Sequence, residues 1–306
     1  MANCLVTKLN GSVDNNELLR VGEMRVKVES VESPTKDTQG FGVAFTEPTT
    51  VEIVGDGYFT DSTLTENKGK SMVVSSLLGV IVSQATTVSI RNKYKLRSLH
   101  VFIPSGNPYG ENKVLNIDDL KYSTSLSSLN LSKMKASGNI DNLKNLTSLN
   151  FLYVRFTQVS GDIASLKNLT ALTSLDVSNS NVSGDIANIY FAIKGTKKEF
   201  NIAYCNNLSG DLASLPNNIL FLNCSYSKSK FTWTKGSSRT NILACASLHC
   251  SNIDDMLNDM ANMTASFAGQ EAHYKTIALI GTRTSASDAA VQTLQSKGYT
   301  VSITPA

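Results

Sequence analysis

Three histidines and five cysteines are the residues from which nucleophilic or metal chemistry would start in this sequence. His249 and Cys250 are adjacent, and a thiol nucleophile needs a base of this kind within reach. Neighbouring residues of a strand point to opposite faces, however, so this pair cannot form a dyad there. The sequence also has no CxxC, HExxH, GxSxG, phosphate-loop or GxGxxG pattern. We therefore predict that the protein is not an enzyme and holds neither zinc nor a cofactor.

Asp162, Asp185 and Asp211 occupy the same place in a repeated motif, and their carboxylates are weak candidates for a calcium site. Like charges stacked about 4.8 Å apart would repel one another, and a bound cation would relieve the repulsion. The alternative is that each aspartate caps a short helical turn that follows it at the surface. We favour the caps and so predict no metal.

The composition excludes several classes of protein. Apolar residues make up 41% of the 306 residues and charged residues 17%, so a large core lies beneath a surface rich in Ser, Thr and Asn. The net charge of +3 is spread evenly, which leaves no basic surface for nucleic acid. The best apolar run, 72–82, is too short to span a membrane. The first residues do not combine a basic with an apolar segment, so we expect no secretory signal.

A four-residue motif marks an internal repeat in the middle of the chain. It reads Ser-Gly-Asn-Ile at 137–140, Ser-Gly-Asp-Ile at 160–163 and 183–186, and Ser-Gly-Asp-Leu at 209–212, with spacings of 23, 23 and 26 residues. An apolar run precedes each copy, and its last two apolar positions alternate with period two, as strand residues facing one side do. One unit cannot bury this face alone, so successive units must stack into a parallel sheet.

The pattern resembles the leucine-rich-repeat family, whose unit is L-x-x-L-x-L-x-x-N/C-x-L. The stretch 172–186 fits it closely, and its Ser-Gly-x-Ile turn is similar to that of one variant of the repeat, although the proline usual after the isoleucine is missing. The Asn position of the family is degenerate here, since Met134, Thr157 and Ser180 occupy it. The resemblance implies a solenoid that presents a binding surface.

Weaker copies extend the array in both directions. Their apolar positions are Leu96, Leu99 and Val101 before the array, then Ile219, Leu222 and Cys224, and then Leu243 and Cys245 after it. In this register Cys224 and Cys245 take the buried strand position held elsewhere by Val154 and Val177. Free cysteine packs there as a small hydrophobe. A disulfide or a reactive thiol is the alternative.

The expected fold is an α/β leucine-rich-repeat solenoid with a parallel sheet and short helical turns, preceded by a small antiparallel β domain and closed by a βαβ cap. Its segments are a β-rich attachment domain (1–70), a connector of undetermined structure (71–95), the solenoid (96–252) and an α/β cap (253–306). Alternation predicts strands at 24–28, 41–45 and 51–54, with turns between them at residues such as Pro48. In the cap we expect a helix through 253–263, a strand at 276–280, a helix ended by Gly298 and a last strand at 299–303.

In such a solenoid, the strand residues that do not enter the core line the concave face. Aromatic residues there are not needed for folding, and mixed with Asn, Asp and Arg they form a candidate patch for a glycan or a protein loop. The alternative is that they pack against one another across strands. The predicted ligand-binding residues are Tyr153, Arg155, Phe156, Asp176, Asn179, Asn201, Tyr204, Asn223 and Tyr226.

Segments 2–9 and 22–28 are similar to N-terminal segments of proteins of gut Bacteroidetes and their phages, which implies an attachment domain on a tail or surface assembly. The first hypothesis is a non-enzymatic adhesion protein of a phage virion, a tail fibre or tail-associated component. Its N-terminal domain docks to a larger assembly, and its concave face contacts a protein or glycan on the host surface. The alternative is a bacterial cell-surface or intracellular interaction scaffold. An enzyme with activity in residues 1–95 ranks last, because no nucleophile motif occurs there.

Overall fold

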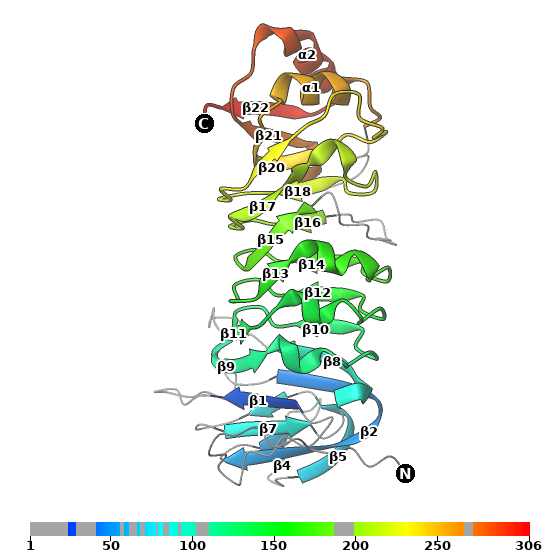
Figure 1. Cartoon of the computed structure of the whole chain (residues 1–306), viewed down its shortest axis with the longest axis vertical. Helices are drawn as coiled ribbons and strands as arrows, with labels where there is room; N and C mark the ends of the chain where they lie inside the picture. The colour runs from blue at the N-terminus through cyan, green and yellow to red at the C-terminus, as the bar shows by residue number, and fades with distance from the viewer. Residues whose placement is uncertain are drawn as a thin grey trace.

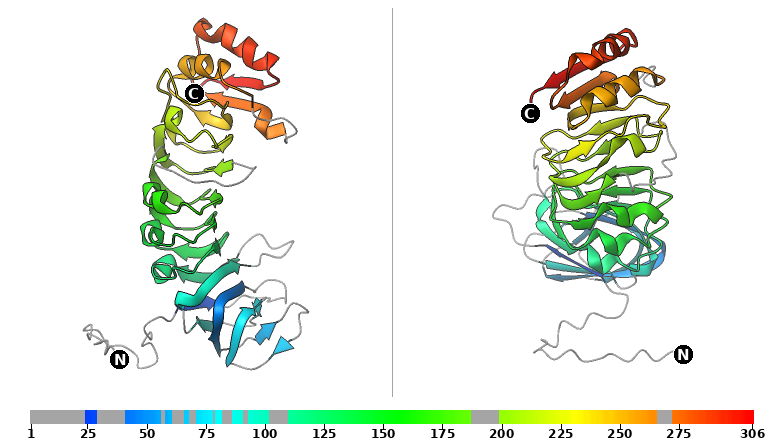
Figure 2. Two further views of the ribbon diagram at one scale, coloured as in Figure 1. Left: turned by 90° about the vertical axis from the view of Figure 1, so that its right-hand side faces the viewer. Right: turned by 45° about the horizontal axis from the view of Figure 1, so that its top comes forward.

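The protein is an elongated stack of coils with antiparallel strands at one end and two helices at the other (Figure 1). The computed structural model describes residues 24–28, 41–55, 58–60, 66–67, 71–77, 79–81, 86–90, 93–101, 110–186, 199–265 and 272–306. The predicted parallel solenoid is confirmed. The stack is curved, and the arrows of its long sheet lie along the inner side (Figure 2).

The long sheet runs the whole length of the molecule. From β8 onward each neighbouring pair is parallel, in the order β8-β10-β12-β14-β16-β18-β20-β21-β22. Its solenoid strands are β8 (Leu96–Val101), β10 (Ser128–Asn130), β12 (Phe151–Tyr153), β14 (Ser174–Asp176), β16 (Glu199–Asn201), β18 (Phe221–Asn223) and β20 (Ala244–His249). We define the concave face as the face of β10 to β18 that does not enter the core.

One apolar side chain per strand enters the core at the same register. Leu129, Leu152, Leu175, Phe200, Leu222 and Cys245 are paired in sequence along the sheet, and all are buried. The prediction for Cys224 holds, since it lies two residues after Leu222 as Val154 lies after Leu152. The prediction for Cys245 is wrong by two residues. Cys245 pairs with Leu222, so it takes the position of Leu152, because the two residues lie 23 positions apart as Leu129 and Leu152 do, whereas the alignment with Cys224 assumed 21.

The other side of each coil carries a short strand and a 3₁₀ turn. The parallel strands β13 (Ser160–Asp162), β15 (Asn181–Asp185), β17 (Asn207–Asp211) and β19 (Lys230–Thr232) form a second sheet. The 3₁₀ turns span Ile117–Leu120, Ile140–Leu143, Ile163–Asn168 and Leu212–Ser214. An Asn or Asp side chain accepts a hydrogen bond from the main chain of each turn and so caps it; the caps are Asn116, Asn139, Asp162 and Asp211.

The N-terminal strands continue the long sheet. They are β1 (Met24–Val28), β2 (Phe41–Gly55), β5 (Ser71–Leu77), β7 (Thr86–Ile90) and β9 (Gly110–Asn116), while β3 (Tyr58–Thr60), β4 (Glu66–Asn67) and β6 (Gly79–Ile81) form a small sheet. β2 pairs antiparallel with β8, and β9 pairs parallel with β11 (Met134–Ser137) on the opposite side of the coil. These strands therefore span both sides of the first coil, and Val26, Val51 and Ile90 belong to one buried cluster with the solenoid leucines.

Two details of this end differ from the sequence analysis. Residues 71–90, expected to connect two parts, contribute β5 and β7, which pair with β2 and so belong to the sheet itself. Pro48 was expected at a turn, but it lies inside the continuous strand β2. The register with β5 shifts between Ala44 and Thr49, which is where a residue without an N–H is tolerated in a strand.

The C-terminal segment extends the same sheet through two strand–helix–strand units. α1 (Ile253–Ala261) joins β20 to β21 (Thr276–Ile280), and α2 (Asp288–Ser296) joins β21 to β22 (Thr300–Thr304). Asp259 fastens α1 to the last coil, because its carboxylate accepts from Trp233 Nε1 at 2.8 Å and from the main-chain N–H of Gly236 at 2.8 Å. In the described part of the chain, no helix is long and apolar enough to cross a membrane.

The junction of α1 and α2 depends on the ionised form of Asp254. Burial alone would raise the pKa of this carboxyl, but hydrogen bonds from Ser287 and Thr284, together with the charge of Arg283, hold it below its usual value. A folded-state pKa below the unfolded one contributes stability above the unfolded pKa, and this contribution is lost as the pH falls through the folded pKa. We therefore expect the Tm difference between the wild type and Asp254→Asn to shrink below about pH 4 in a thermal melt series. A difference that stays constant down to pH 2 would contradict this.

Candidate functional site

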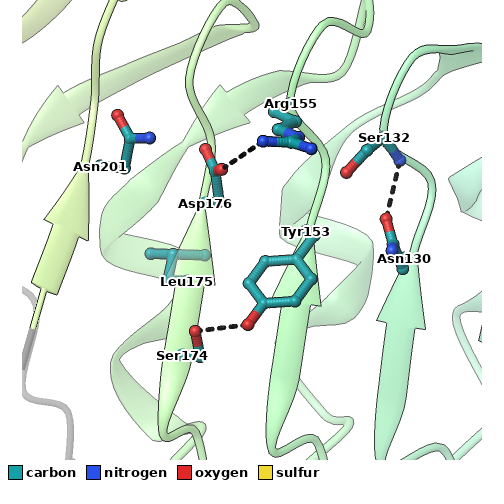
Figure 3. A pocket seen from close by; sticks show the side chains of 8 residues that line it. All are labelled: Asn130, Ser132, Tyr153, Arg155, Ser174, Leu175, Asp176 and Asn201. Atoms are coloured by element: carbon teal, nitrogen blue, oxygen red, sulfur yellow. Dashed lines mark hydrogen bonds and ion pairs between the residues drawn. The ribbon is translucent and has the colours of Figure 1, made fainter. Parts of the chain in front are cut away.

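A shallow pocket of about 350 Å³ lies on the concave face between β10 and β16. Its lining residues are Asn130, Ser132, Tyr153, Arg155, Ser174, Leu175, Asp176 and Asn201. The Tyr153 hydroxyl lies 2.7 Å from Ser174 Oγ, and Arg155 Nη1 lies 4.0 Å from Asp176 Oδ2, so two side chains of the β12 coil reach across to β14 (Figure 3). Leu175 is the single apolar residue in the lining, so the pocket presents mainly hydroxyl, amide, guanidinium and carboxylate groups.

A turn formed by an Asn side chain recurs along this face, and we call the series of these turns the Asn ladder. In three coils an Asn at the last strand position accepts a hydrogen bond from the main-chain N–H two residues later. These bonds run from Ser132 to Asn130, from Ala203 to Asn201 and from Ser225 to Asn223, each 3.1 Å long. A side chain that bonds its own main chain in this way stabilises the turn. Asn201 and Asn223, predicted as ligand contacts, therefore have a structural role, although Asn201 also lines the pocket.

Among the five coils from β10 to β18, two depart from this ladder, and both departures lie in the pocket. Tyr153 replaces Asn in the β12 coil and has no group that could make the turn. Asp176 replaces Asn in the β14 coil and keeps the turn, since Oδ1 accepts from the Ser178 N–H at 3.0 Å. Burial raises the pKa of Asp176, against the lowering effects of the Ser178 hydrogen bonds and of Arg155. The charge of Asp176 is therefore a cost to the fold that a neutral Asn would avoid.

A column of strained residues borders the pocket. Lys133, Phe156, Asn179, Tyr204 and Tyr226 each stand three residues after the last strand residue of their coil, and each has a positive φ between 49° and 63°. This left-handed conformation is disfavoured by roughly 1 kcal/mol or more for residues other than Gly and Asn. The main chain fixes the column, because Phe156 N donates to Ser178 O at 3.0 Å and Tyr204 N to Ser225 O at 3.0 Å.

The aromatic members of the column face solvent. Phe156 is 40% exposed, Tyr204 44% and Tyr226 75%. Tyr204 and Tyr226 stack on each other with ring centroids 4.7 Å apart and ring planes within 16°. The alternative interpretation, that the aromatic residues pack against one another across strands, therefore holds for Tyr204 and Tyr226. Towards the C-terminus, other side chains cover the first residue of β18, because His273 and Tyr274 pack on Phe221.

The sequence analysis missed half of the strand residues on this face. It considered the residue after each core position but not the one before it, so it passed over Ser174 and Phe151, which is 40% exposed. The period-two alternation of a strand was the available signal, because both neighbours of Leu152 or Leu175 must lie on the face opposite the core. The positive φ values of the column could not be predicted from the residue types, since Lys, Phe and Tyr do not favour that conformation.

The aspartates that were weak candidates for a calcium site have structural roles. Asp162 Oδ1 caps its 3₁₀ turn through the Ala164 N–H and Asp211 Oδ1 does so through the Ala213 N–H, as the capping interpretation predicts. Among the described residues, which include Asp185, no three His, Cys, Asp or Glu side chains lie close enough together to hold a metal ion.

Four of the cysteines are buried free thiols. Burial raises the pKa of Cys205 to about 11 and that of Cys245 to about 12, and it also raises those of Cys224 and Cys250. All four are therefore protonated at neutral pH, where the nucleophilic form of cysteine is the thiolate.

No family model and no curated protein matches the sequence. Among solved structures, the chain is similar to the leucine-rich-repeat ectodomain of the receptor kinase SOBIR1 of Arabidopsis thaliana, at 20% identity over 44% of this chain and 73% of that one, with a TM-score of 0.34. It is also similar to an internalin, InlF, of Listeria monocytogenes, at 18% identity over 71% of this chain and 70% of that one, with a TM-score of 0.31.

A third similar structure is the ectodomain of the Arabidopsis thaliana receptor kinase GASSHO1/SCHENGEN3. The identity is 20% over 62% of this chain, which spans 25% of that one, and the TM-score is 0.38. The fold assignment rests on the register of apolar residues along β10 to β20. The fold is a leucine-rich-repeat solenoid.

Proposed function

We propose that the protein is a non-enzymatic binding protein that holds its ligand in the concave pocket between β10 and β16. The observation that carries this proposal is the place where the Asn ladder is broken. Tyr153 and Asp176 stand where the coils of β10, β16 and β18 carry a turn-forming Asn, and both line the pocket. A residue that departs from its own repeat, at a cost in stability, is explained by a contact outside the chain.

The raised pKa of Asp176 supports the same conclusion. Its Oδ2 lies 4.0 Å from Arg155 Nη1, which is longer than a charge-assisted hydrogen bond, so the two groups are incompletely paired. A ligand that offers hydrogen-bond donors to the carboxylate and acceptors to the guanidinium would satisfy both. The residues that line this pocket include no cysteine and no histidine. The arrangement therefore suits recognition and not turnover.

Reverting the pocket to the repeat's own pattern tests this proposal. Tyr153→Asn and Asp176→Asn each install the residue that the neighbouring coils use, so we expect unchanged or higher Tm values by differential scanning fluorimetry. We expect each to weaken binding about tenfold or more, because a buried polar contact to the ligand is lost. The measurement is retention of fluorescently labelled protein on intact cells of gut Bacteroidetes strains, which the N-terminal resemblance suggests as targets.

Lys167→Ala provides the matched control, because Lys167 is exposed on the opposite side of the coil, in the 3₁₀ turn Ile163–Asn168. It should be retained on cells like the wild type. Variants of Tyr153 and Asp176 that bind as the wild type does would show that the pocket is not the site. Absence of wild-type binding to every strain would contradict the proposal itself.

A more specific form of the proposal places the protein on a phage particle, with its N-terminal part docked to the tail and the solenoid facing outward. The resemblance of segments 2–9 and 22–28 to proteins of gut Bacteroidetes and their phages supports it; of these segments, only 24–28 lie within the described residues. Mass spectrometry of purified particles from the source would test this form. Stoichiometric amounts in particles support it, and enrichment in the cell envelope or cytosol instead would leave a cellular interaction scaffold.

A further inference from the structure

We infer that the ligand is a neutral carbohydrate and that the stacked pair Tyr204–Tyr226 is the platform on which a sugar ring lies. This inference rests on the proposed function, since it names the ligand class of the same concave face. The pair adjoins the pocket: Tyr204 follows the pocket residue Asn201 by three positions, and Ala203 between them accepts a hydrogen bond from Asn179 N at 2.8 Å. The platform residue Tyr204 and the pocket residue Asn201 therefore belong to the same coil.

The first step of the argument is the open face of Tyr226. Its ring is stacked against Tyr204 on one side, yet its residue is 75% exposed, so the other face of the ring is uncovered. An exposed aromatic face, held rigid by a stacked neighbour, binds an apolar planar surface with little loss of side-chain freedom. The C–H face of a pyranose ring has this shape, and its hydroxyls point outward in the ring plane.

The second step is the strain at these two positions. Tyr204 and Tyr226 have φ values of 58° and 59°, whereas Asn179 occupies the same column position with a residue type that tolerates such values. Asn would therefore serve the backbone better than Tyr in both coils. Neither ring is buried in the core, so packing inside the molecule does not explain the choice.

The third step is the polarity of the pocket beside the platform. A protein partner is usually anchored by an apolar or aromatic side chain that fills an apolar hole. This pocket has Leu175 as its single apolar lining residue, and Leu175 is buried. Its planar amide, carboxylate and guanidinium groups, in Asn130, Asp176 and Arg155, are instead suited to paired hydrogen bonds with adjacent hydroxyls.

The fourth step is the charge balance. The charged residues in the pocket lining are Arg155 and Asp176, one of each sign, and they lie beside each other. A pocket for sialic or uronic acids, or for a phosphorylated sugar, would carry an excess of cationic groups. The observed balance favours a neutral sugar.

The deciding variant is Tyr204→Asn/Tyr226→Asn, in the full-length protein, because it relieves the strain while removing the platform. Labelled wild type and variant are applied to a printed array of neutral and acidic oligosaccharides and of extended peptides, and their Tm values are measured. We expect the wild type to bind neutral oligosaccharides, and the variant to bind them about tenfold or more weakly at an unchanged or higher Tm. Tyr122→Asn removes an equally exposed tyrosine that follows the 3₁₀ turn Ile117–Leu120, and it should bind like the wild type.

Three results would overturn the inference. They are a wild type that binds no neutral oligosaccharide, a double variant that binds as well as the wild type, and a double variant whose Tm falls along with its binding, which would make the stack structural. Pretreatment of the cells used above separates this inference from the proposed function. Retention that is lost in Asp176→Asn, removed by protease and unaffected by periodate, which cleaves vicinal diols, would leave the pocket as the site but make its ligand a protein.

Discussion

Gly161→Ala should unfold the protein at a clearly lower temperature, with a loss of about 2–4 kcal/mol in the free energy of unfolding. Gly161 has φ +109°, a conformation that L side chains rarely adopt. A Cβ placed there would lie 2.0 Å from Asn139 Oδ1, the oxygen that caps the previous 3₁₀ turn through the Asp141 N–H at 2.9 Å. The substitution therefore strains the backbone and also displaces a cap.

This geometry explains the repeated Ser-Gly-x-Ile motif. At Gly138 and Gly184, as at Gly161, an added Cβ would meet the capping oxygen of the preceding coil at about 2.1 Å, from Asn116 and Asp162 respectively. The glycine of one coil thus leaves space for the cap of the coil before it.

A matched control separates the two components of the loss. Gly236 also has a positive φ, of 80°, but an added Cβ would meet nothing within 4 Å. Gly236→Ala should therefore cost only the backbone component, about 1 kcal/mol. Chemical denaturation of both variants against the wild type measures the difference. Equal losses in the two variants would show that the contact between coils contributes nothing.

Arg239→Met should destabilise the protein by roughly 3–5 kcal/mol, although Met preserves most of the volume of the side chain. Arg239 is 5% exposed, and burial lowers its pKa to about 10, so it is still charged at neutral pH. Its guanidinium donates to Leu215 O at 2.7 Å, to Pro216 O at 2.8 Å and to Ile219 O at 2.8 Å. Without it, Leu215 O and Ile219 O would lose this donor in the interior.

The local sequence explains why an arginine is needed here. The 3₁₀ turn Leu212–Ser214 is the shortest of its series, and Pro216, which has no N–H to donate, lies two residues after it. Of the three carbonyls that Arg239 contacts, Pro216 O also accepts from the Ile219 N–H at 3.0 Å. The guanidinium supplements the main-chain donors of this segment. Arg239→Lys should recover only part of the loss, since a single ammonium cannot reach carbonyls on both sides. Arg97→Met, at an exposed arginine, is the control and should change stability by less than about 0.5 kcal/mol. A loss at Arg239 no larger than at Arg97 would contradict this account.

The solenoid could be predicted because its determinants are periodic. The LxxLxL spacing gave the strands from β8 to β18 and their register, since a slip of one residue would place Leu on the solvent face. The prediction failed for the register of Cys245, where the coil is two residues longer than the alignment assumed, and no structure could be predicted for residues 71–90, where pairing with distant β2 decides it. Pairing between distant strands is not local, so no window of sequence contains it.

The candidate site was predicted less completely for a related reason. Tyr153, Arg155 and Asp176 could be placed on the concave face from strand alternation alone, and all three line the pocket. The strain at Phe156, Tyr204 and Tyr226 could not be foreseen, because it arises from hydrogen bonds between coils that fix an unfavourable φ for whichever residue stands there. That Asn201 and Asn223 belong to turns was visible in principle, since Asn recurs at that position in the repeat.

In the column at positive φ, the backbone conformation and the identity of the side chain are determined separately. Main-chain hydrogen bonds between coils impose the conformation of the column, and other residues fill the core of the solenoid. Lys, Phe, Asn and Tyr therefore all occur in the column without altering the stack. Each coil therefore offers one position at which a substitution changes what the surface recognises and leaves the scaffold intact. A lineage under pressure to follow a changing target can vary these positions one coil at a time, and duplication of a coil adds a further position to the series.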